Sequence, residues 1–316
     1  MIGTQLGQAN LTIFGETLQE LAEKDPAIIV VTSDSRGSGK LVPYGQELPD
    51  QIVEMGIAEQ NLVGVAAGLA MTGKKVFAVS PACFLTARSL EQIKNDVAYS
   101  DHPVKLIGIS AGVSYGALGT THHSLHDYAV LRAINNIDIV APADNFETRE
   151  AIKAAASHPR PIYIRYGKKT MLDLHAPNAT FEIGKAITLM DGDEVTLIAS
   201  GEPTERALLA AQELKKQGIS SRVISMHTVK PLDVDTLLQV AQNTKVLITV
   251  EEHSVNGGLG EACASILMQA GIMLPFKIVG IPDEYTVTGS QLEIFDHYGI
   301  SVDGLVQTAY DLLKKV

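Results

Sequence analysis

The sequence predicts an α/β protein of two consecutive domains, each built on a parallel sheet. Short runs of β-branched residues alternate with helical patterns along the chain, which is typical of βαβ units. The 316 residues are enough for two domains of about 150 residues each. Hydrophobic residues make up 46% and charged residues 19%, which indicates a chain that buries a core rather than a disordered one.

Strands of the first half are expected where short apolar, β-branched runs occur. Residues 12–23 have the spacing of an amphipathic helix, and residues 58–71 that of a second one. On this second helix Gly64 and Gly68 share a face, and glycines four apart allow a neighbouring helix or subunit to come close. The expected strands are 28–32, 76–80, 104–110, 137–140 and 162–165.

The boundary between the domains is expected where both periodicities stop. Residues 168–177 show neither the helical nor the strand periodicity and include Pro177, as is typical of a connecting segment. The expected division is a first domain over 1–170, a linker over 171–190 and a second domain over 191–316. The second βα series has expected strands at 195–200, 222–226, 245–250 and 276–281, and helices at 203–217, 233–242, 258–269 and 302–315.

Composition and charge exclude several classes of function. Thirty-six acidic against twenty-five basic residues give a net charge of −11, which disfavours nucleic acid as a partner. The longest apolar run, 62–71, is well short of the ~20 residues that span a bilayer, and no secretory signal is visible. Cys83 and Cys263 are far apart in sequence and form no metal-type pair, so we expect a protein of the reducing cytoplasm.

Residues 55–60 place Glu59 between an apolar stretch and a helix of small residues. Burial there penalises the charge of a carboxylate and favours a proton held near neutral pH, which suits proton chemistry with a bound ligand. A glutamate in the first turn of a helix is more often exposed, because the helix dipole stabilises its negative charge. The chemical interpretation therefore requires Glu59 to be buried.

The loop from Gly116 to Asp127 contains His122, His123 and His126. His122 and His126 are four apart, which suits a metal on one helix face, but no third ligand is evident beyond Asp127. A loop histidine that donates a proton or binds a hydroxyl is favoured over a metal ligand, because imidazole titrates near neutrality. We expect His122 in that role, and capping or surface contacts for His123 and His126.

Two further segments carry ligand-type signals. Residues 254–261 superficially resemble a phosphate-binding turn before a helix, but their spacing differs from the dinucleotide fingerprint, so we interpret them as a tight turn with an interface role. Arg165 ends an expected strand, where its guanidinium would project into the crevice in which α/β sheets bind ligands. A phosphate or carboxylate contact and a structural ion pair are equally compatible with this position.

Four short segments form a set that is far more specific than any one of them. They are residues 56–61 (Gly-Ile-Ala-Glu-Gln-Asn), residues 81–86 (Pro-Ala-Cys-Phe-Leu-Thr), the Gly-Thr-Thr-His loop that ends at His122, and residues 141–144 (Ala-Pro-Ala-Asp). Together they resemble the transketolase family of thiamine diphosphate enzymes. The resemblance covers almost the whole chain and implies a pyrimidine-binding domain followed by the family's C-terminal domain. The chain length and the missing front half resemble the second subunit of a split transketolase.

The resemblance implies transfer of a two-carbon ketol unit from a phosphorylated ketose to an aldose. By this resemblance, Glu59 hydrogen-bonds the pyrimidine ring nitrogen of thiamine diphosphate and favours the imino tautomer of the cofactor. Ile57 belongs to the same cofactor-binding segment. Phe84 matches an aromatic residue that stacks on the pyrimidine, and His122 a histidine that contacts the reacting hydroxyls. Asp34 matches an aspartate near the cofactor, and Ser38 matches a serine that contacts phosphate. Arg165 matches an arginine that binds the substrate phosphate.

Some positions depart from the family pattern. Leu118 stands four residues before the loop histidine, where many sugar-phosphate transketolases have an aspartate, and Ser110 stands where they often have a histidine. Leucine cannot hydrogen-bond a hydroxyl, so we expect weak turnover of xylulose phosphate compared with another phosphorylated ketose. The family also commonly has an arginine near Thr12, and aromatic residues where this chain has Ala87 and Leu90.

The chain lacks the family's Gly-Asp-Gly segment, which binds the diphosphate and its divalent metal; residues 190–193 (Met-Asp-Gly-Asp) have the wrong order. The resemblance therefore implies a separate partner subunit that holds Mg²⁺ or a similar ion, with no metal ligand in this chain. We expect an α2β2 heterotetramer with sites at subunit interfaces, and an isolated chain that is inactive.

Three alternatives stay open at this point. The β subunit of a 2-oxoacid dehydrogenase has a similar size and domain order, although the Thr-Thr-His-His loop and the Phe84 segment are more similar to transketolase. Deoxyxylulose-phosphate synthase is another relative, usually with both halves in one chain. A non-catalytic interaction subunit is the alternative of a different class, which replacement of Glu59 would have favoured; the glutamate is present.

Overall fold

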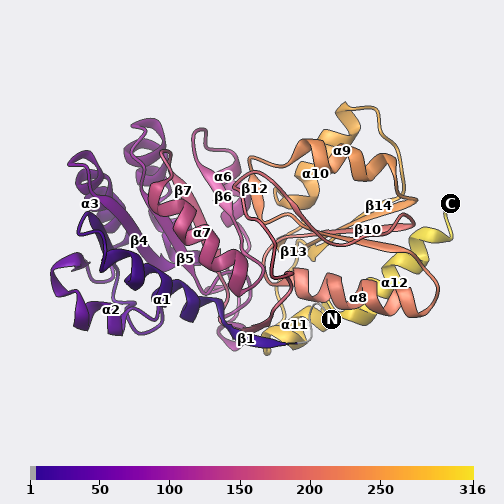
Figure 1. Cartoon of the computed structure of the whole chain (residues 1–316), viewed down its shortest axis with the longest axis horizontal. Coiled ribbons are helices and arrows are strands. Elements are labelled where there is room, and N and C mark those ends of the chain that lie inside the picture. The colour runs from indigo at the N-terminus through magenta and orange to yellow at the C-terminus, as the bar shows by residue number, and fades with distance from the viewer. Residues whose placement is uncertain (1–4) are drawn as a thin grey trace.

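The computed structural model describes residues 5–316 and contains two α/β domains side by side (Figure 1). The first contains a seven-stranded sheet in the order β12-β6-β7-β5-β4-β2-β3. All its neighbouring strands are parallel except β12 and β6. The strands are β2 (Ile28–Thr32), β3 (Ile52–Glu54), β4 (Lys75–Pro81), β5 (Lys105–Ile109), β6 (Asp138–Val140), β7 (Ile162–Tyr166) and β12 (Thr228–Lys230).

Helices cover both faces of this sheet because its strands carry apolar side chains on both sides. One face packs against α1, where Phe14 and Leu18 are buried, and against α7. The other packs against α3, through Leu62 and Ala66, and against the helices after β4. The helices of this half are α1 (Asn10–Ala22), α2 (Val42–Glu47), η1 (Pro49–Gln51), α3 (Glu59–Met71), α4 (Ala82–Arg88), α5 (Leu90–Gln92), the π-helical η2 (Ile93–Tyr99), η3 (Gly116–Leu118), α6 (Asp127–Arg132) and α7 (Asn145–Ser157).

The second domain repeats this layered plan on a five-stranded sheet in the order β14-β13-β10-β11-β9. Apolar residues of α8 and α12 pack on one face, and those of α9 and α10 on the other. Its elements are β9 (Ile187–Met190), β10 (Val195–Ala199), α8 (Pro203–Lys216), β11 (Ser221–Ser225), α9 (Val234–Gln242), β13 (Val246–Ser254), α10 (Leu259–Gln269), β14 (Phe276–Ile281), α11 (Gln291–His297) and α12 (Val302–Leu313).

The predicted α/β class is confirmed, and each strand and helix expected from periodicity is present within a few residues of its predicted bounds. Three features differ from the expectation. Strand β12 leaves the second half of the chain to pair antiparallel with β6 of the first sheet. Strand β9, inside the range expected as a linker, is an antiparallel edge of the second sheet. A short ribbon pairs β1 (Leu6–Ala9) with β8 (Thr170–Leu172).

The connecting segment is tied to both domains by a buried ionic cluster around His175. Its Nδ1 lies 2.8 Å from Asp144 and its Nε2 lies 3.0 Å from Glu147, and its side chain is 2% exposed. Ser225, in the second domain, donates a hydrogen bond of 2.6 Å to Glu147. Burial opposes the charge on His175, but the two carboxylates outweigh it and raise the pKa to about 10.

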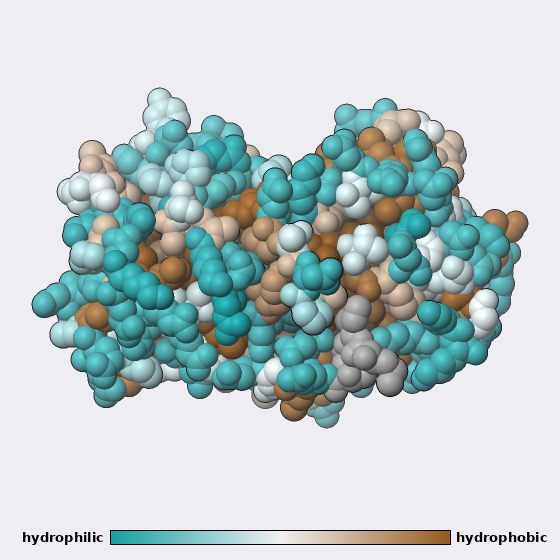
Figure 2. All heavy atoms as spheres, viewed as in Figure 1, coloured by the Kyte–Doolittle hydropathy of each residue, from teal (hydrophilic) through white to brown (hydrophobic). Residues whose placement is uncertain are grey.

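The surface is mostly hydrophilic on the face shown in Figure 2, with hydrophobic residues visible where the two domains meet. Among residues 5–316, no helix is long and apolar enough to cross a membrane.

Candidate active site

Most of the site residues predicted from the sequence gather where the parallel strands of the first sheet end. Glu59 follows β3, Asp34 and Ser38 follow β2, Phe84 follows β4, and the histidine loop follows β5. These strands are neighbours, since β3, β2, β4 and β5 lie in that order in the sheet. The carboxyl edge of such a sheet is where α/β proteins bind ligands.

Glu59 is buried, as its chemical interpretation required, with 3% of its side chain exposed. It is the first residue of α3 and opens on a pocket of about 590 Å³. Ile57, at 73% exposure, and Asn61 also line this pocket. Gly56 has a φ of +70°, a backbone conformation that favours glycine and that turns the chain from β3 toward the helix.

Glu54 holds the two loops beside this pocket together. Its Oε1 accepts hydrogen bonds from the backbone N–H of Asp34 at 2.6 Å and of Gly56 at 3.0 Å, and its Oε2 lies 3.3 Å from Arg36 Nε. Asp34 itself is exposed, with a φ of +49°. Sequence reasoning missed Glu54, although its place at the carboxyl end of a strand was a usable signal.

Phe84 and Arg88 lie four residues apart on α4 and therefore share a helix face. The Arg88 guanidinium carbon lies 4.2 Å from the centre of the Phe84 ring. Arg88 Nη1 also donates to both carboxylate oxygens of Glu59, at 3.1 and 3.0 Å. Arg88 is not among the residues predicted from the sequence, although its spacing from Phe84 was a signal for it.

His122 is brought next to Phe84, from a loop 38 residues further along the chain. The two ring centres are 5.3 Å apart in an edge-to-face arrangement, and Tyr115 contacts His122 at the same distance and in the same way. His122 Nδ1 lies 2.9 Å from the Thr121 hydroxyl. Tyr115, which sequence reasoning missed, is flanked by Lys168, whose ammonium lies 3.7 Å from the ring centre.

Lys168 is exposed and lies two residues after the end of β7, at the same edge of the sheet. Partial burial lowers the pKa of Lys168. Among residues 5–316 its ammonium makes no ion pair within 4.0 Å, so its charge is open to an anionic ligand.

Ser38, Leu118 and Ser110 occupy different environments around this edge. Ser38 is exposed on the loop after β2, and its hydroxyl donates to the Ser35 carbonyl at 3.1 Å. Leu118 is 56% exposed in η3, on the loop that carries His122. Ser110 is buried directly after β5 with a φ of +54°.

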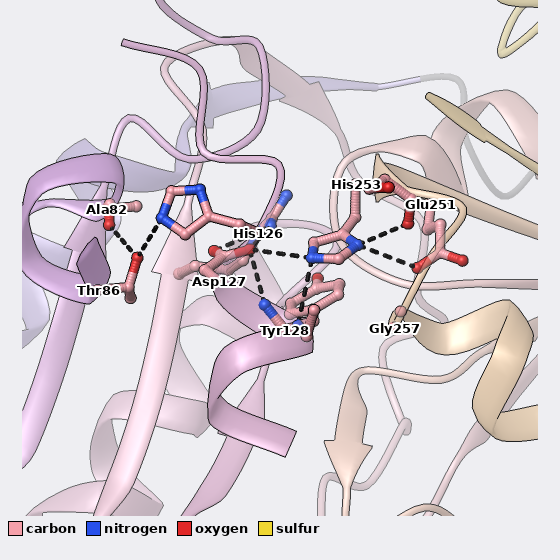
Figure 3. A network of polar contacts seen from close by, with 12 residues as sticks. Ala82, Thr86, His126, Asp127, Tyr128, Glu251, His253 and Gly257 are labelled. Carbon is pink, nitrogen blue, oxygen red and sulfur yellow. Dashed lines mark hydrogen bonds and ion pairs between the residues drawn. The ribbon is translucent and has the colours of Figure 1, made fainter. Parts of the chain in front are cut away.

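The remaining loop histidines point to different neighbours. His123 is buried with Nε2 2.9 Å from the Gly116 carbonyl oxygen, and burial lowers its pKa. His126 Nε2 lies 3.2 Å from the Thr86 hydroxyl, which itself donates to the Ala82 carbonyl (Figure 3). His122 and His126 do not share a helix face, because His126 immediately precedes α6 and His122 lies in the loop before it. Within residues 5–316 no group of three or more His, Cys, Asp and Glu side chains is placed to hold a metal ion.

Arg165 lies in the contact between the two domains rather than beside His122. It is 5% exposed, and its Nη1 donates to both oxygens of Asp127, at 2.8 and 3.0 Å. Its Nη2 donates to the backbone carbonyl of Glu252 at 2.7 Å. Burial opposes the charge of Arg165, but Asp127, Tyr128, Glu252 and Tyr163 together outweigh burial and raise the pKa of Arg165. The structure therefore places Arg165 in a buried ion pair, one of the two roles that the sequence left open.

The same contact includes the glycine turn over residues 254–261. His253 stacks on Tyr128 with ring centres 4.8 Å apart, and its Nε2 lies 3.7 Å from Asp127 (Figure 3). Glu251 accepts hydrogen bonds from the first N–H groups of α10, at Leu259 (2.6 Å) and Gly260 (2.8 Å). Because this carboxylate occupies the helix N-terminus, the turn serves the contact between domains and offers no phosphate site.

The fold and the pocket define an α/β protein with a buried carboxylate that opens on a pocket beside an aromatic ring. Residues 7–172 match the family model "Transketolase, pyrimidine binding domain", and residues 184–305 match "Transketolase, C-terminal domain". The chain belongs to the transketolase family, so the resemblance read from its motifs is confirmed.

Individual relatives extend this match over nearly the whole chain. One subunit of the apulose-4-phosphate transketolase of Phocaeicola vulgatus is 49% identical, over 96% of both chains. The 6-deoxy-6-sulfo-D-fructose transketolase subunit SqwH of a Clostridium species is 33% identical, over 95% of this chain and 93% of its own. A solved structure described as "Split gene transketolase, inactive beta4 tetramer" is 35% identical with a TM-score of 0.89, over 98% of this chain and 99% of its own. The chain is thus a transketolase-type transferase subunit, with the size of the corresponding subunit of split enzymes.

Proposed function

We propose that this chain binds the pyrimidine end of thiamine diphosphate in a two-component transketolase and supplies the residues that handle its proton. The observation that carries the proposal is Glu59, a buried carboxylate that opens on a pocket beside an aromatic ring. When bound, thiamine diphosphate supplies the electron sink that a two-carbon transfer requires.

The residues present fit an aminopyrimidine. The Glu59 carboxylate already holds one planar N–H donor, the Arg88 guanidinium, which is also stacked on Phe84. A planar heterocycle with a ring nitrogen has the same needs: a partner for its proton and an aromatic face. In the proposed site Glu59 holds a proton at that nitrogen, Phe84 stacks on the ring, Ile57 supplies an apolar wall, and Asp34 lies nearby on the β2 loop.

His122 and Lys168 are assigned to the sugar substrate. His122 is held edge-on between Phe84 and Tyr115, which fixes the direction in which its free nitrogen meets a hydroxyl. Lys168, which lies against the ring of Tyr115, offers a positive charge for the substrate phosphate, whereas the guanidinium of Arg165 is held in its ion pair with Asp127. The exposed hydroxyl of Ser38 is a second candidate for phosphate.

A partner subunit completes the site. This chain has no Gly-Asp-Gly segment for the diphosphate, so the diphosphate and Mg²⁺ or a similar ion are assigned to a separate N-terminal-half subunit, in an α2β2 assembly. The inactive state of the related β4 tetramer supports this division of labour. Two buried, unpaired cysteines, Cys83 and Cys263, support a reducing cytoplasmic location.

The names of the relatives bear on the substrate. Apulose 4-phosphate and 6-deoxy-6-sulfofructose are anionic ketoses other than the common pentose phosphates. The exposed apolar Leu118 on the His122 loop agrees with a substrate that lacks one of the usual hydroxyl contacts. The proposed donor is therefore an anionic ketose such as apulose 4-phosphate.

Reconstitution tests the proposal. The chain is assayed alone and mixed with a partner that carries the Gly-Asp-Gly motif, with thiamine diphosphate, Mg²⁺ and an aldose as acceptor. The donors are apulose 4-phosphate, 6-deoxy-6-sulfofructose and xylulose phosphate. We expect no ketol transfer by the chain alone, transfer by the pair, and a lower kcat/KM for xylulose phosphate than for another ketose. Turnover by the chain alone contradicts the proposal, and a chain that captures no such partner favours the non-catalytic interaction subunit.

A further inference from the structure

Arg88 was not predicted as a site residue, but it contacts two residues that were, Glu59 and Phe84. One guanidinium meets both groups that the proposed function assigns to the pyrimidine: the carboxylate of Glu59, at 3.0 and 3.1 Å, and the ring face of Phe84, at 4.2 Å. A guanidinium and a protonated aminopyrimidine are both planar, carry N–H donors at the edge and stack on aromatic rings. Two ligands with the same contacts cannot occupy them together.

We propose that the Arg88 guanidinium is a built-in placeholder for the aminopyrimidine of the cofactor, which displaces it on binding. This inference rests on the proposed function, because that function assigns Glu59 and Phe84 to the pyrimidine.

The free subunit has a physical reason to fill this position. Glu59 is almost fully buried, and a buried carboxylate without a partner is strongly destabilising. Arg88 supplies that partner, and it also covers the Phe84 ring, which is otherwise only half-buried.

Arg88 also has a way out. Its side chain is 47% exposed, it lines the pocket wall, and it belongs to the last turn of α4. Rotation of its side chain therefore returns the guanidinium to water, which compensates for much of the lost ion pair because half-exposed ion pairs contribute little net stability. The buried Arg165, in contrast, is held by Asp127 and Glu252 and has no comparable exit.

The placeholder predicts that removal of the guanidinium strengthens cofactor binding. Arg88→Met keeps the length of the stem and removes the competing N–H donors. By calorimetry on the reconstituted pair, its Kd for thiamine diphosphate should fall about fivefold or more, since an ion pair worth ~1 kcal/mol no longer has to be broken. The Kd of the isolated full-length chain for thiamine, which has the pyrimidine without the diphosphate, should fall in parallel. Arg88→Lys, which keeps the charge, should lie between Arg88→Met and the unsubstituted protein.

Three other variants separate this inference from the proposed function. Arg149→Met removes an exposed arginine on α7 and should leave both Kd values unchanged. Glu59→Gln and Phe84→Leu should raise both Kd values if the pyrimidine site is assigned correctly. An unchanged or raised Kd in Arg88→Met, with Glu59→Gln and Phe84→Leu behaving as expected, overturns the placeholder and leaves the function standing. If Glu59→Gln and Phe84→Leu have no effect on binding, the proposed site itself is wrong.

Discussion

Both carboxylate oxygens of Asp127 accept a hydrogen bond from the same nitrogen of Arg165, Nη1, at 2.8 and 3.0 Å. This ion pair lies in the contact between the two domains. Tyr163 adds a third hydrogen bond to the same carboxylate, at 2.7 Å. His126, the neighbour of Asp127 in the chain, instead contacts Thr86 of α4, the helix that also carries Phe84 (Figure 3). One short segment thus connects the domain contact to the proposed active site.

Asp127→Asn tests how much this contact stabilises the fold. Removing one partner of a buried ion pair leaves the other charge uncompensated, so we expect a loss of about 3–5 kcal/mol in the free energy of unfolding. Urea denaturation measures it. Asp311→Asn, at an exposed pair with Lys314, is the matched control and should cost at most about 1 kcal/mol. A small effect at Asp127, equal to that at Asp311, would show that the pair does not stabilise the domain contact.

Glu59→Gln tests the proton chemistry of the proposed site. Glutamine keeps the size and one acceptor of the side chain but cannot hold or release the proton, so kcat of the reconstituted pair should fall about 100-fold or more. Complex formation, followed by size-exclusion chromatography, should be unaffected. Glu91→Gln, an exposed glutamate after α4, provides the control. Full activity of Glu59→Gln would reject the role assigned to Glu59.

Lys168→Met tests the contact with the substrate phosphate. Loss of one charge-assisted contact should raise KM for a phosphorylated ketose about 10- to 100-fold, with a smaller change in kcat. An unphosphorylated ketose should be turned over equally by both proteins. Lys215→Met, on the exposed side of α8, should change neither constant. An equal loss with both kinds of ketose would mean that Lys168 acts on something other than the phosphate.

Titration of His175 is expected to make the free energy of unfolding decrease as the pH becomes alkaline. Its pKa is about 10 in the folded protein and about 6.5 in an unfolded chain, so the folded state holds a proton that the unfolded state releases. The stabilisation is fully present below about pH 6.5 and is lost as pH rises through about 10. We therefore expect the free energy of unfolding to decline over this window.

His175→Gln should flatten that decline and lower stability at pH 6.5, because Asp144 and Glu147 lose their cation. His297→Gln, at an exposed position, should leave the pH profile unchanged. The same slope in His175→Gln as in the unsubstituted protein would assign the pH dependence to other groups.

The secondary structure was largely predictable because each element carries its own periodicity. Strand β2, for example, coincides with the apolar run 28–32. What could not be predicted are partners distant in sequence. The Asp127–Arg165 pair is separated by 38 residues and Arg165 meets Glu252 across 87, so no local pattern distinguishes this buried pair from a ligand contact.

The candidate site was predictable to a similar extent. Burial of Glu59 was the condition for its chemical interpretation and is met, and the Phe84 and His122 segments were recognised as part of the same set. Arg88 was within reach of a spacing argument, but its partner Glu59 is 29 residues away on another helix. Lys168 and Tyr115 meet only because their loops follow adjacent strands, β7 and β5.

Strand β12 ties the second half of this chain to the sheet of the first domain. Thr228 and Lys230 pair with Val140 and Ile139 and cover the outer edge of β6. A fragment that ends near residue 170 would leave that edge unpaired, an invitation to aggregation through intermolecular β-pairing. Because the second half of the chain closes the first sheet, hinge bending between domains is also a poor route to opening the site. We therefore expect access to the proposed site to come from loop and side-chain movements around the pocket at Glu59.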